Sequence, residues 1–324
     1  MNQRNNLLMK IKQIFIESPQ ITDILADISE CREFSDGVAE PDCMIVVGDT
    51  GSGKTTIIEK YLSENPRKEN IDGSVVPILF TSLPPNATPI TASEQLLSDL
   101  GDPYAFIKGK DHVELTKKMV ELMHICGVEL IIIDEFQHMI DRKNKEVLHS
   151  VADWLKMLIV RSKIPVVLFG MPYSIVILDA NNQLAGRFEL QHKLEPFRIS
   201  SKAYMQRYKT FLSCLDSALP FTDCSGLDSP EMMKRLYVFS KGNLRRIRKL
   251  VNRASKSALA DGDSYISLNH FAKAAPKVSR SSCIPLNPFT AELEKLKIEH
   301  PSEDTGWENY INQQDTVVSI KNVL

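Results

Sequence analysis

The hydrophobic pattern of the chain changes near residue 200. Before that point, short apolar runs are separated by stretches in which apolar residues recur every three or four positions, as in amphipathic helices. Such runs predict strands that are buried in a parallel sheet, and they cover residues 44–47, 75–83, 129–135, 164–169 and, with an alternating pattern, 189–194. Strands that alternate with helices indicate an α/β fold with a doubly wound, mostly parallel sheet.

Helical spacing alone continues after residue 200. The predicted helices form a small all-helical domain and cover residues 204–219, 229–240, 243–260 and 268–275. At the other end of the chain, residues 5–33 predict one or two amphipathic helices that pack against the core. We therefore expect four parts, which are an N-terminal helical extension (1–40), an α/β core (41–199), a helical domain (200–276) and a tail (277–324).

The predicted tail differs in composition from the rest. It is polar, is interrupted by prolines and holds seven acidic residues, and its only helical pattern is short, over residues 291–298. Two interpretations fit this composition: the tail becomes ordered on a partner, or it is flexible.

One helix start is predicted from a local motif. Thr91 is followed three residues later by Glu94, as in a capping box. We therefore expect a helix over residues 91–100 with Thr91 at its N-terminal cap.

Composition and charge narrow the class of protein. The chain of 324 residues is 43% hydrophobic and 25% charged with a net charge of −2, as expected of a soluble globular protein. This small charge excludes attraction of the whole chain to nucleic acid or membrane, so such contacts would need local patches. The six cysteines include no C-x-x-C pair, which favours reduced thiols in the cytoplasm. We see no run long enough to span a membrane and no signal-peptide core.

The most specific motif follows the first predicted strand. Residues 48–55 match the phosphate-loop pattern G-x-x-x-x-G-K-[ST] at every fixed position, between an apolar run and a helical stretch. Glycines let the backbone curve around phosphate oxygens, and the next helix directs the positive end of its dipole at them. The expected nucleotide-binding residues are Gly48, Asp49, Thr50, Gly51, Ser52, Gly53, Lys54, Thr55 and Thr56.

Acidic residues at the end of another strand complete the nucleotide signature. Asp134 and Glu135 follow four apolar residues, so they are expected at the carboxyl end of a buried parallel strand, where ligands bind in α/β folds. Lys54 would neutralise the β- and γ-phosphates, Thr55 and Asp134 would hold Mg²⁺, and Glu135 would activate the attacking water. The sequence thus predicts an ATPase with ATP and Mg²⁺ as cofactors.

A basic helix face is predicted in the helical domain. Over residues 243–260, apolar residues gather on one side of the helix and Arg245, Lys249, Arg253 and Lys256 on the other. No acidic residue lies between Lys241 and Lys256. The face is either a solvated surface or a site for an anion, such as nucleotide phosphate or a nucleic-acid backbone.

The order of these motifs resembles that of the AAA+ ATPases, in which a small helical lid follows a phosphate-loop sheet. Residues 242–245 are similar to the second-sensor helix, which implies that Arg245 reaches the γ-phosphate. Residues 184–188 resemble the segment with the arginine finger, which implies that Arg187 completes the catalytic site of a neighbouring subunit. Hydrolysis would then be slow and would depend on assembly.

One position departs from the AAA+ pattern. Members of that family usually carry a polar first-sensor residue at the end of the fourth strand, where this chain has Gly170 and Met171. Slow hydrolysis, or another residue in the sensor role, would both fit this departure.

A closer resemblance is to the TnsC/TniB family of AAA+ regulators of DNA transposition. The likeness covers roughly residues 10–275, and its motifs are residues 45–48, 132–138, 164–170 and 182–188. It implies an ATPase that assembles as a ring or filament on duplex DNA, irrespective of sequence, and disassembles on hydrolysis. It also implies a target-selection protein and transposase subunits as partners.

The resemblance suggests which basic residues contact DNA, since AAA+ loops at two positions face a central channel. The candidates are Lys108, Lys110, Lys117, Lys118, Arg142, Lys143 and Lys145, and each is equally well explained as an ordinary surface residue. Three other functions remain open, which are a helicase loader, a small-molecule P-loop kinase and a scaffold that binds ATP without hydrolysis. A kinase would leave the Arg187 segment without a role, and the intact Asp134–Glu135 pair argues against a scaffold.

Overall fold

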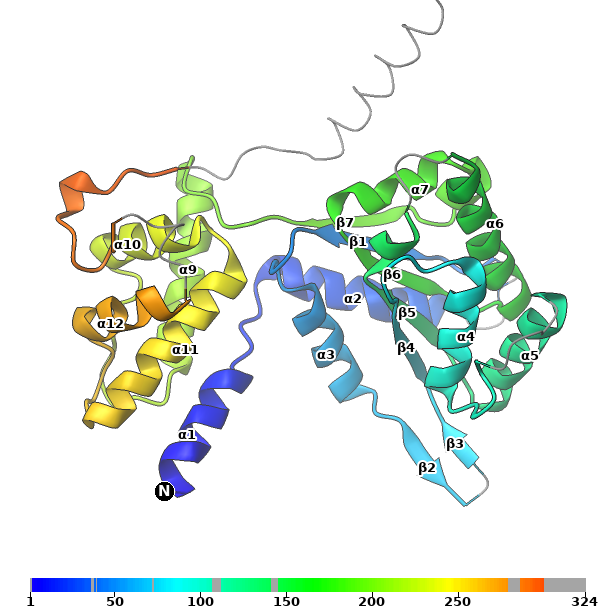
Figure 1. The fold of residues 1–324 in the computed structure, drawn as a ribbon, viewed down its shortest axis with the longest axis horizontal. Coiled ribbons are helices and arrows are strands. Elements are labelled where there is room, and N and C mark those ends of the chain that lie inside the picture. Colours follow the sequence, from blue (N-terminus) through cyan, green and yellow to red (C-terminus); the bar gives the residue numbers. More distant parts are fainter. Residues whose placement is uncertain are drawn as a thin grey trace, which may run out of the picture. The chain divides into compact units, whose positions relative to one another are not determined.

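The computed structural model describes residues 2–35, 38, 40–71, 73–106, 112–140, 145–278 and 286–299 (Figure 1). Within this part, the chain forms two compact units. Residues 19–50 and 54–194 form the unit that we call the α/β unit, and residues up to 18, residues 51–53 and residues from 195 onward form the helical unit.

A five-stranded sheet forms the centre of the α/β unit. Its strand order is β4-β5-β6-β1-β7, and all neighbours are parallel. The strands are β1 (Met44–Gly48), β4 (Ile78–Ser82), β5 (Leu130–Asp134), β6 (Val166–Gly170) and β7 (Leu190–Leu194). Three of the four continuous apolar runs are the fully buried strands β1, β5 and β6, and the alternating run is the edge strand β7.

Helices cover both faces of this sheet (Figure 1). Leu130 and Ile132 of β5 pack in one hydrophobic cluster with α2 (Pro19–Phe34) and α3 (Lys54–Glu64). Ile131 and Ile133 pack in the other cluster, which includes α4 (Pro89–Leu100), α5 (His112–Ile125) and α6 (Lys145–Ser162). Because side chains of a strand alternate between faces, one apolar run serves both clusters, and the predicted doubly wound sheet is confirmed.

Short elements complete the α/β unit. They are the hairpin β2 (Lys68–Asn70) and β3 (Gly73–Val75), the 3-10 helices η1 (Phe136–Met139) and η2 (Pro172–Ile175), and the single-turn helices α7 (Val176–Asp179) and α8 (Asn182–Ala185). The hairpin is the main difference from the predicted strand over residues 75–83. Pro77 separates β3 from β4, since proline has no amide hydrogen to donate to a sheet.

The start of α4 also differs from the prediction. Thr88, not Thr91, is the N-terminal cap, and Pro89 occupies the first turn. The Thr88 hydroxyl accepts from the Thr91 amide at 3.2 Å, and the Thr91 hydroxyl accepts from the Thr88 amide at 2.8 Å. The prediction at Thr91 was wrong because Thr91 itself occupies the third position of the motif, where glutamate or glutamine is usual.

The helical unit consists of helices around its own hydrophobic core. They are α1 (Asn2–Gln13), α9 (Lys202–Ala218), α10 (Pro230–Ser240), α11 (Leu244–Asp261) and α12 (Leu268–Val278). Side-chain caps define three of the helix starts, since Ser201, Ser229 and Asn243 each accept a hydrogen bond from an amide in the first turn. In the core, the rings of Tyr208 and Tyr237 meet edge to face at 5.9 Å.

One basic residue joins the first helix to this unit. The Arg248 guanidinium of α11 donates to the Ile11 carbonyl at 3.0 Å and to the Ile14 carbonyl at 3.1 Å, at the C-terminal end of α1. Burial lowers the pKa of Arg248, because it disfavours the charged form. The residues that we expected to form one N-terminal extension are therefore shared, with α1 in the helical unit and α2 in the α/β unit.

Residues 286–299 lie against the helical unit, where the sequence predicted a tail. The Phe289 ring stacks on Phe271 of α12 at 5.3 Å, and Arg235 of α10 donates to the carbonyls of Pro288 and Ala291. In place of a helix over residues 291–298 there is the single 3-10 turn η3 (Leu293–Lys295). Within the described residues, we find no helix long and apolar enough to cross a bilayer.

The packing of Phe289 gives a stability prediction. Replacing Phe289, which is 2% exposed, by alanine should destabilise the helical unit by ~3 kcal/mol, because the change leaves a cavity. Hydrogen–deuterium exchange of the α10 and α12 amides would measure the loss. Leu286→Ala is the control, since Leu286 is 46% exposed, and equal exchange in both variants would contradict the packing role.

Candidate functional site

The carboxyl ends of three neighbouring strands meet at one edge of the sheet. β6 lies between β1 and β5, and the register pairs Val47 with Gly170 and Ile133 with Leu168. The phosphate loop after β1, Met171 after β6 and Glu135 after β5 therefore leave the sheet at the same edge. This is where parallel α/β folds bind their ligands.

The phosphate loop has the backbone that its glycines permit. Gly51 and Gly53 have φ values of 84° and 111°, a region that side-chain-bearing residues rarely adopt. α3 begins immediately afterwards at Lys54, and Thr55 and Thr56 are exposed in its first turn. The loop thus ends at a helix N-terminus, which favours anions.

Polar groups at this loop suit a triphosphate. The Lys54 side chain is only 8% exposed, and its ammonium donates to the carbonyls of Gly48 at 2.5 Å and Asp49 at 3.2 Å. The Ser52 hydroxyl is buried and has no hydrogen-bond partner among the described residues. A buried cation and an unpaired hydroxyl at a helix N-terminus match the chemistry of a phosphate group.

Asp134 is buried at the end of β5, with 4% of its surface exposed. Burial raises the pKa of its carboxyl group, and the hydrogen bond from the Glu135 amide (2.8 Å) and the positive charge of Lys54 partly offset this effect. A carboxylate that is costly to bury in the charged form is suited to hold a cation such as Mg²⁺.

Glu135 adopts an unusual backbone conformation directly after the strand. Its φ and ψ of 56° and 33° are left-handed, which is uncommon for a residue other than glycine and is frequent at functional sites. This turn starts η1 and brings Gln137 back to the strand end. The Gln137 amide nitrogen donates to the Glu135 carboxylate, and its oxygen accepts from the Met171 amide at 3.2 Å.

Gln137 was not among the predicted site residues. Its sequence signals were its position two residues after the acidic pair and its place in the motif over residues 132–138, and neither assigns it a role. The contact with Met171 could not be predicted, because 34 residues separate the two partners in sequence.

Arg187, the predicted arginine finger, is held by its own chain. Its guanidinium pairs with Glu40 at 2.9 Å, its side chain is 12% exposed, and Nε and Nη1 are buried without a hydrogen-bond partner among the described residues. Its carbonyl accepts from the Cys43 amide at 2.8 Å, just before β1. The Arg187 backbone thus lies at the amino end of β1, ~16 Å along that strand from the phosphate loop.

The remaining predicted residues are dispersed. Arg245 lies in the helical unit, exposed in the first turn of α11 together with the predicted basic face of Lys249, Arg253 and Lys256. In the α/β unit, Lys117 pairs with Glu121 at 3.7 Å, Lys118 pairs with Asp102 at 2.5 Å, and Lys145 is exposed at the start of α6. Lys108, Lys110, Arg142 and Lys143 lie outside the described residues.

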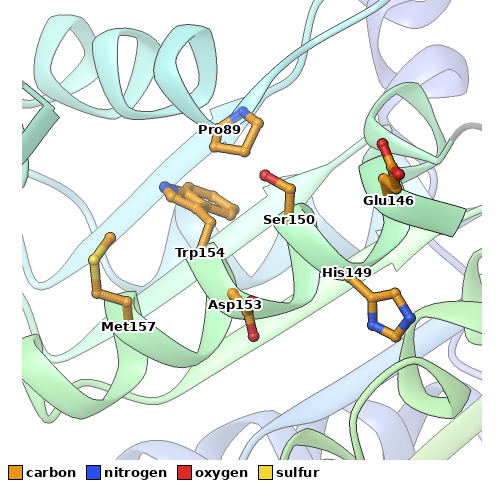
Figure 2. Close-up of a pocket in the computed structure, with 7 residues that line it drawn as sticks. All are labelled: Pro89, Glu146, His149, Ser150, Asp153, Trp154 and Met157. Carbon is orange, nitrogen blue, oxygen red and sulfur yellow. The ribbon is translucent and has the colours of Figure 1, made fainter.

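A hollow lies elsewhere, along α6 and the start of α4 (Figure 2). Pro89, Glu146, His149, Ser150, Asp153, Trp154 and Met157 line it, so it contains none of the nucleotide motifs. The Trp154 indole nitrogen donates to the Ser93 hydroxyl at 2.9 Å, which indicates a packing role. Among the residues that the structure describes, no group of three or more acidic, histidine or cysteine side chains is placed to hold a metal ion.

Comparison with protein families gave a direct match. A family model described as "Bacterial TniB protein" matches residues 9–198 of the chain, which include the phosphate loop, the acidic pair and the Arg187 segment. A search of curated proteins found no match.

Solved structures agree with the fold. The chain is similar to the Aeropyrum pernix ORC2 protein in ADPNP–ADP complexes, with a TM-score of 0.56, 14% identity and coverage of 94% of this chain and 88% of that one. It is also similar to Cdc6p from Pyrobaculum aerophilum, with a TM-score of 0.57, 13% identity and coverage of 86% of this chain and 74% of that one. A third similar structure is that of the Aeropyrum pernix ORC1 protein in complex with DNA, with a TM-score of 0.51, 15% identity and coverage of 82% of this chain and 67% of that one. The predicted AAA+ fold, a phosphate-loop sheet followed by a helical domain, is confirmed.

The raised pKa of Asp134 leads to a test in which one substitution should raise the melting temperature and weaken nucleotide binding. Because the Asp134 carboxyl has a higher pKa in the folded chain than in the unfolded chain, the folded protein loses stability as pH rises above the pKa of the unfolded chain. Asparagine carries no charge at any of these pH values, so it removes this loss. Asp134→Asn should therefore raise the melting temperature at pH 7 without nucleotide, with the gain vanishing near pH 4. The same variant should bind Mg²⁺–ATP more weakly.

Thermal unfolding across that pH range and titration with a fluorescent ATP analogue would measure the two effects. Asp153→Asn, at an exposed position of α6, is the control. A variant that melts at or below the wild-type temperature at pH 7 would contradict the stated cost of burying the Asp134 charge.

Proposed function

Because the chain belongs to the TniB family, we propose that it is an ATP-dependent regulator of DNA transposition. It assembles on duplex DNA, links a target-selection protein to transposase subunits in the cytoplasm, and disassembles when ATP is hydrolysed. The observation that supports this most is the convergence of Lys54, Asp134 and Glu135 at one edge of the sheet in a chain of that family.

Each of these residues has a distinct part in ATP hydrolysis. Lys54 binds the β- and γ-phosphates, and Thr55 and Asp134 hold Mg²⁺, which when bound neutralises charge on the phosphate oxygens. Glu135 orients a water molecule and accepts its proton. By the family resemblance, Arg245 contacts the γ-phosphate and reports whether it is present.

The position of Arg187 supports hydrolysis between subunits. Its backbone lies at the amino end of β1, whereas the phosphate loop follows the carboxyl end of the same strand, so Arg187 does not serve the site of its own chain. In an assembly it leaves Glu40 and neutralises charge in the transition state at a neighbour's site. Hydrolysis is then tied to assembly.

Binding to DNA is the second part of the proposal. Among the solved structures similar to this chain is one of ORC1 in complex with DNA, and a net charge of −2 requires local basic patches for such a contact. Lys145 is the strongest of the described candidates, because a lysine at a helix N-terminus opposes the helix dipole and so does not serve helix stability. Lys118 is the weakest, because Asp102 already neutralises it.

The decisive experiment combines nucleotide binding with imaging. Lys54→Ala should weaken ATP binding at least about 100-fold, since a charge-assisted contact contributes ~3 kcal/mol. Electron microscopy with duplex DNA and a slowly hydrolysed ATP analogue should then show rings or filaments for the wild type only. Lys60→Ala is the matched control, because Lys60 lies on the same helix and pairs with Glu64 at the surface.

The outcomes separate the proposal from its rivals. Assembly by Lys54→Ala that still depends on ATP would refute the site. ATP consumption that needs a small acceptor instead of DNA would indicate a kinase. Binding to a replicative helicase without any response to transposase would indicate a helicase loader.

A mixing experiment tests the role of Arg187. Arg187→Ala should bind ATP normally but lose about 10³-fold in turnover, which is the lower range for an arginine finger. Lys54→Ala should also be inactive. A mixture of the two should recover activity at mixed interfaces, where the Arg187→Ala subunit supplies a phosphate loop that binds ATP and the Lys54→Ala subunit supplies an intact arginine. A mixture as inactive as its components would contradict a shared site.

The ion pair with Glu40 gives a further variant for the same assay. Glu40→Gln should release the Arg187 guanidinium and lower the protein concentration at which the ATPase rate is half-maximal. Glu69→Gln is the control, since that acid pairs with Arg67 at the surface. An unchanged concentration dependence would show that the pair does not restrain Arg187.

A further inference from the structure

The carboxyl end of β6 lacks a polar side chain of its own. Gly170 ends the strand, and a Cβ atom built there would lie 2.4 Å from the Ser174 hydroxyl oxygen and 3.4 Å from the Gln137 side-chain oxygen. The space beside residue 170 is therefore filled by side chains from η1 and η2. A residue larger than glycine at this position would displace one of them.

The orientation of the Gln137 amide follows from its partners. The Met171 backbone amide can only donate, so the Gln137 atom at 3.2 Å from it must be the oxygen. The nitrogen of the same group then faces Glu135 and donates to its carboxylate. Both ends of one planar group are satisfied, which fixes its rotation as well as its position.

Met171 in turn lies against the phosphate loop. The Thr50 hydroxyl and the Met171 sulfur are 3.7 Å apart. A continuous set of contacts thus runs from the phosphate loop through Met171 and Gln137 to Glu135. Ser174 is close to the same strand end, but its buried hydroxyl has no hydrogen-bond partner among the described residues and does not take part.

We propose that Gln137 is the positioning residue for Glu135. It would take the place of the polar first-sensor residue that AAA+ proteins usually carry at the end of the strand equivalent to β6. It holds one oxygen of the Glu135 carboxylate, so that the carboxylate keeps a single orientation toward water. Because it also binds the backbone after β6, it sets this orientation relative to the phosphate loop. The inference rests on the proposed ATPase function, in which Glu135 is the base.

Removal of this amide should affect the chemical step and leave binding intact. Gln137→Ala should lower kcat in the presence of DNA by about 10- to 100-fold, the cost of misplacing a catalytic group by about 1 Å. The dissociation constant of a fluorescent ATP analogue should stay within twofold of the wild-type value. Gln137→Glu should be at least as slow, because it keeps the size of the side chain and replaces the donor by a second carboxylate.

Two comparisons separate positioning from a structural effect. Ser174→Ala removes a buried polar group at the same strand end and should retain kcat, since its hydroxyl makes no contact with Glu135. In a Glu135→Gln background, Gln137→Ala should cause no additional loss, because the group that it positions is already absent. Circular dichroism and melting temperatures of all variants would confirm that they fold.

Each outcome has one meaning. If the wild type with DNA hydrolyses no ATP, the proposed ATPase function fails. If the wild type is active and Gln137→Ala keeps its kcat within twofold, the ATPase function remains and the role of Gln137 is overturned. A parallel loss of kcat and nucleotide affinity, or a further loss in the Glu135→Gln background, would also overturn it.

Discussion

The burial of opposite charges at one edge of the sheet is the constraint on which the α/β unit depends. The Lys54 ammonium and the Asp134 carboxylate are both almost completely buried, and each loses hydration on burial. The carbonyls of Gly48 and Asp49 and the amide of Glu135 stabilise them in the structure. This arrangement needs β1, β6 and β5 to be parallel neighbours, because only then do their carboxyl ends meet.

The two ends of β1 lie next to different parts of the proposed catalytic site. The phosphate loop follows its carboxyl end, and Arg187 is hydrogen-bonded at its amino end through the Cys43 amide. In the proposed assembly, a subunit with the nucleotide site at one end and the arginine at the other would pair with its copies head to tail. Such heterologous contacts close into rings or continue as helical filaments, depending on the rotation between subunits. The opposite ends of one strand are therefore compatible with either form of the proposed assembly.

Two side chains to which we assign roles in ATP hydrolysis are restrained by the chain itself. Arg187 is paired with Glu40, and Gln137 is held between Glu135 and Met171. In the helical unit, one basic residue of α11 makes contacts within the unit, whereas others are exposed to solvent. Arg248 is half-buried and joins α1 to the unit, whereas Arg245, Lys249, Arg253 and Lys256 are exposed on one face. A charged helix face that is not used for packing remains available for phosphate groups.

Local sequence determined most of the helices and strands and the phosphate loop of this protein. Continuous apolar runs marked β1, β5 and β6, and residues 48–55 marked the phosphate loop, because strand burial and glycine conformations depend on short stretches of chain. Tertiary structure alone decided which distant residues meet. The pairing of Glu40 with Arg187, the bridge from Gln137 to Met171, and the packing of Phe289 on Phe271 join positions that no local pattern connects. Such contacts arise only when the strands take their order in the sheet and the helices close over their cores, and that order is a property of the whole fold.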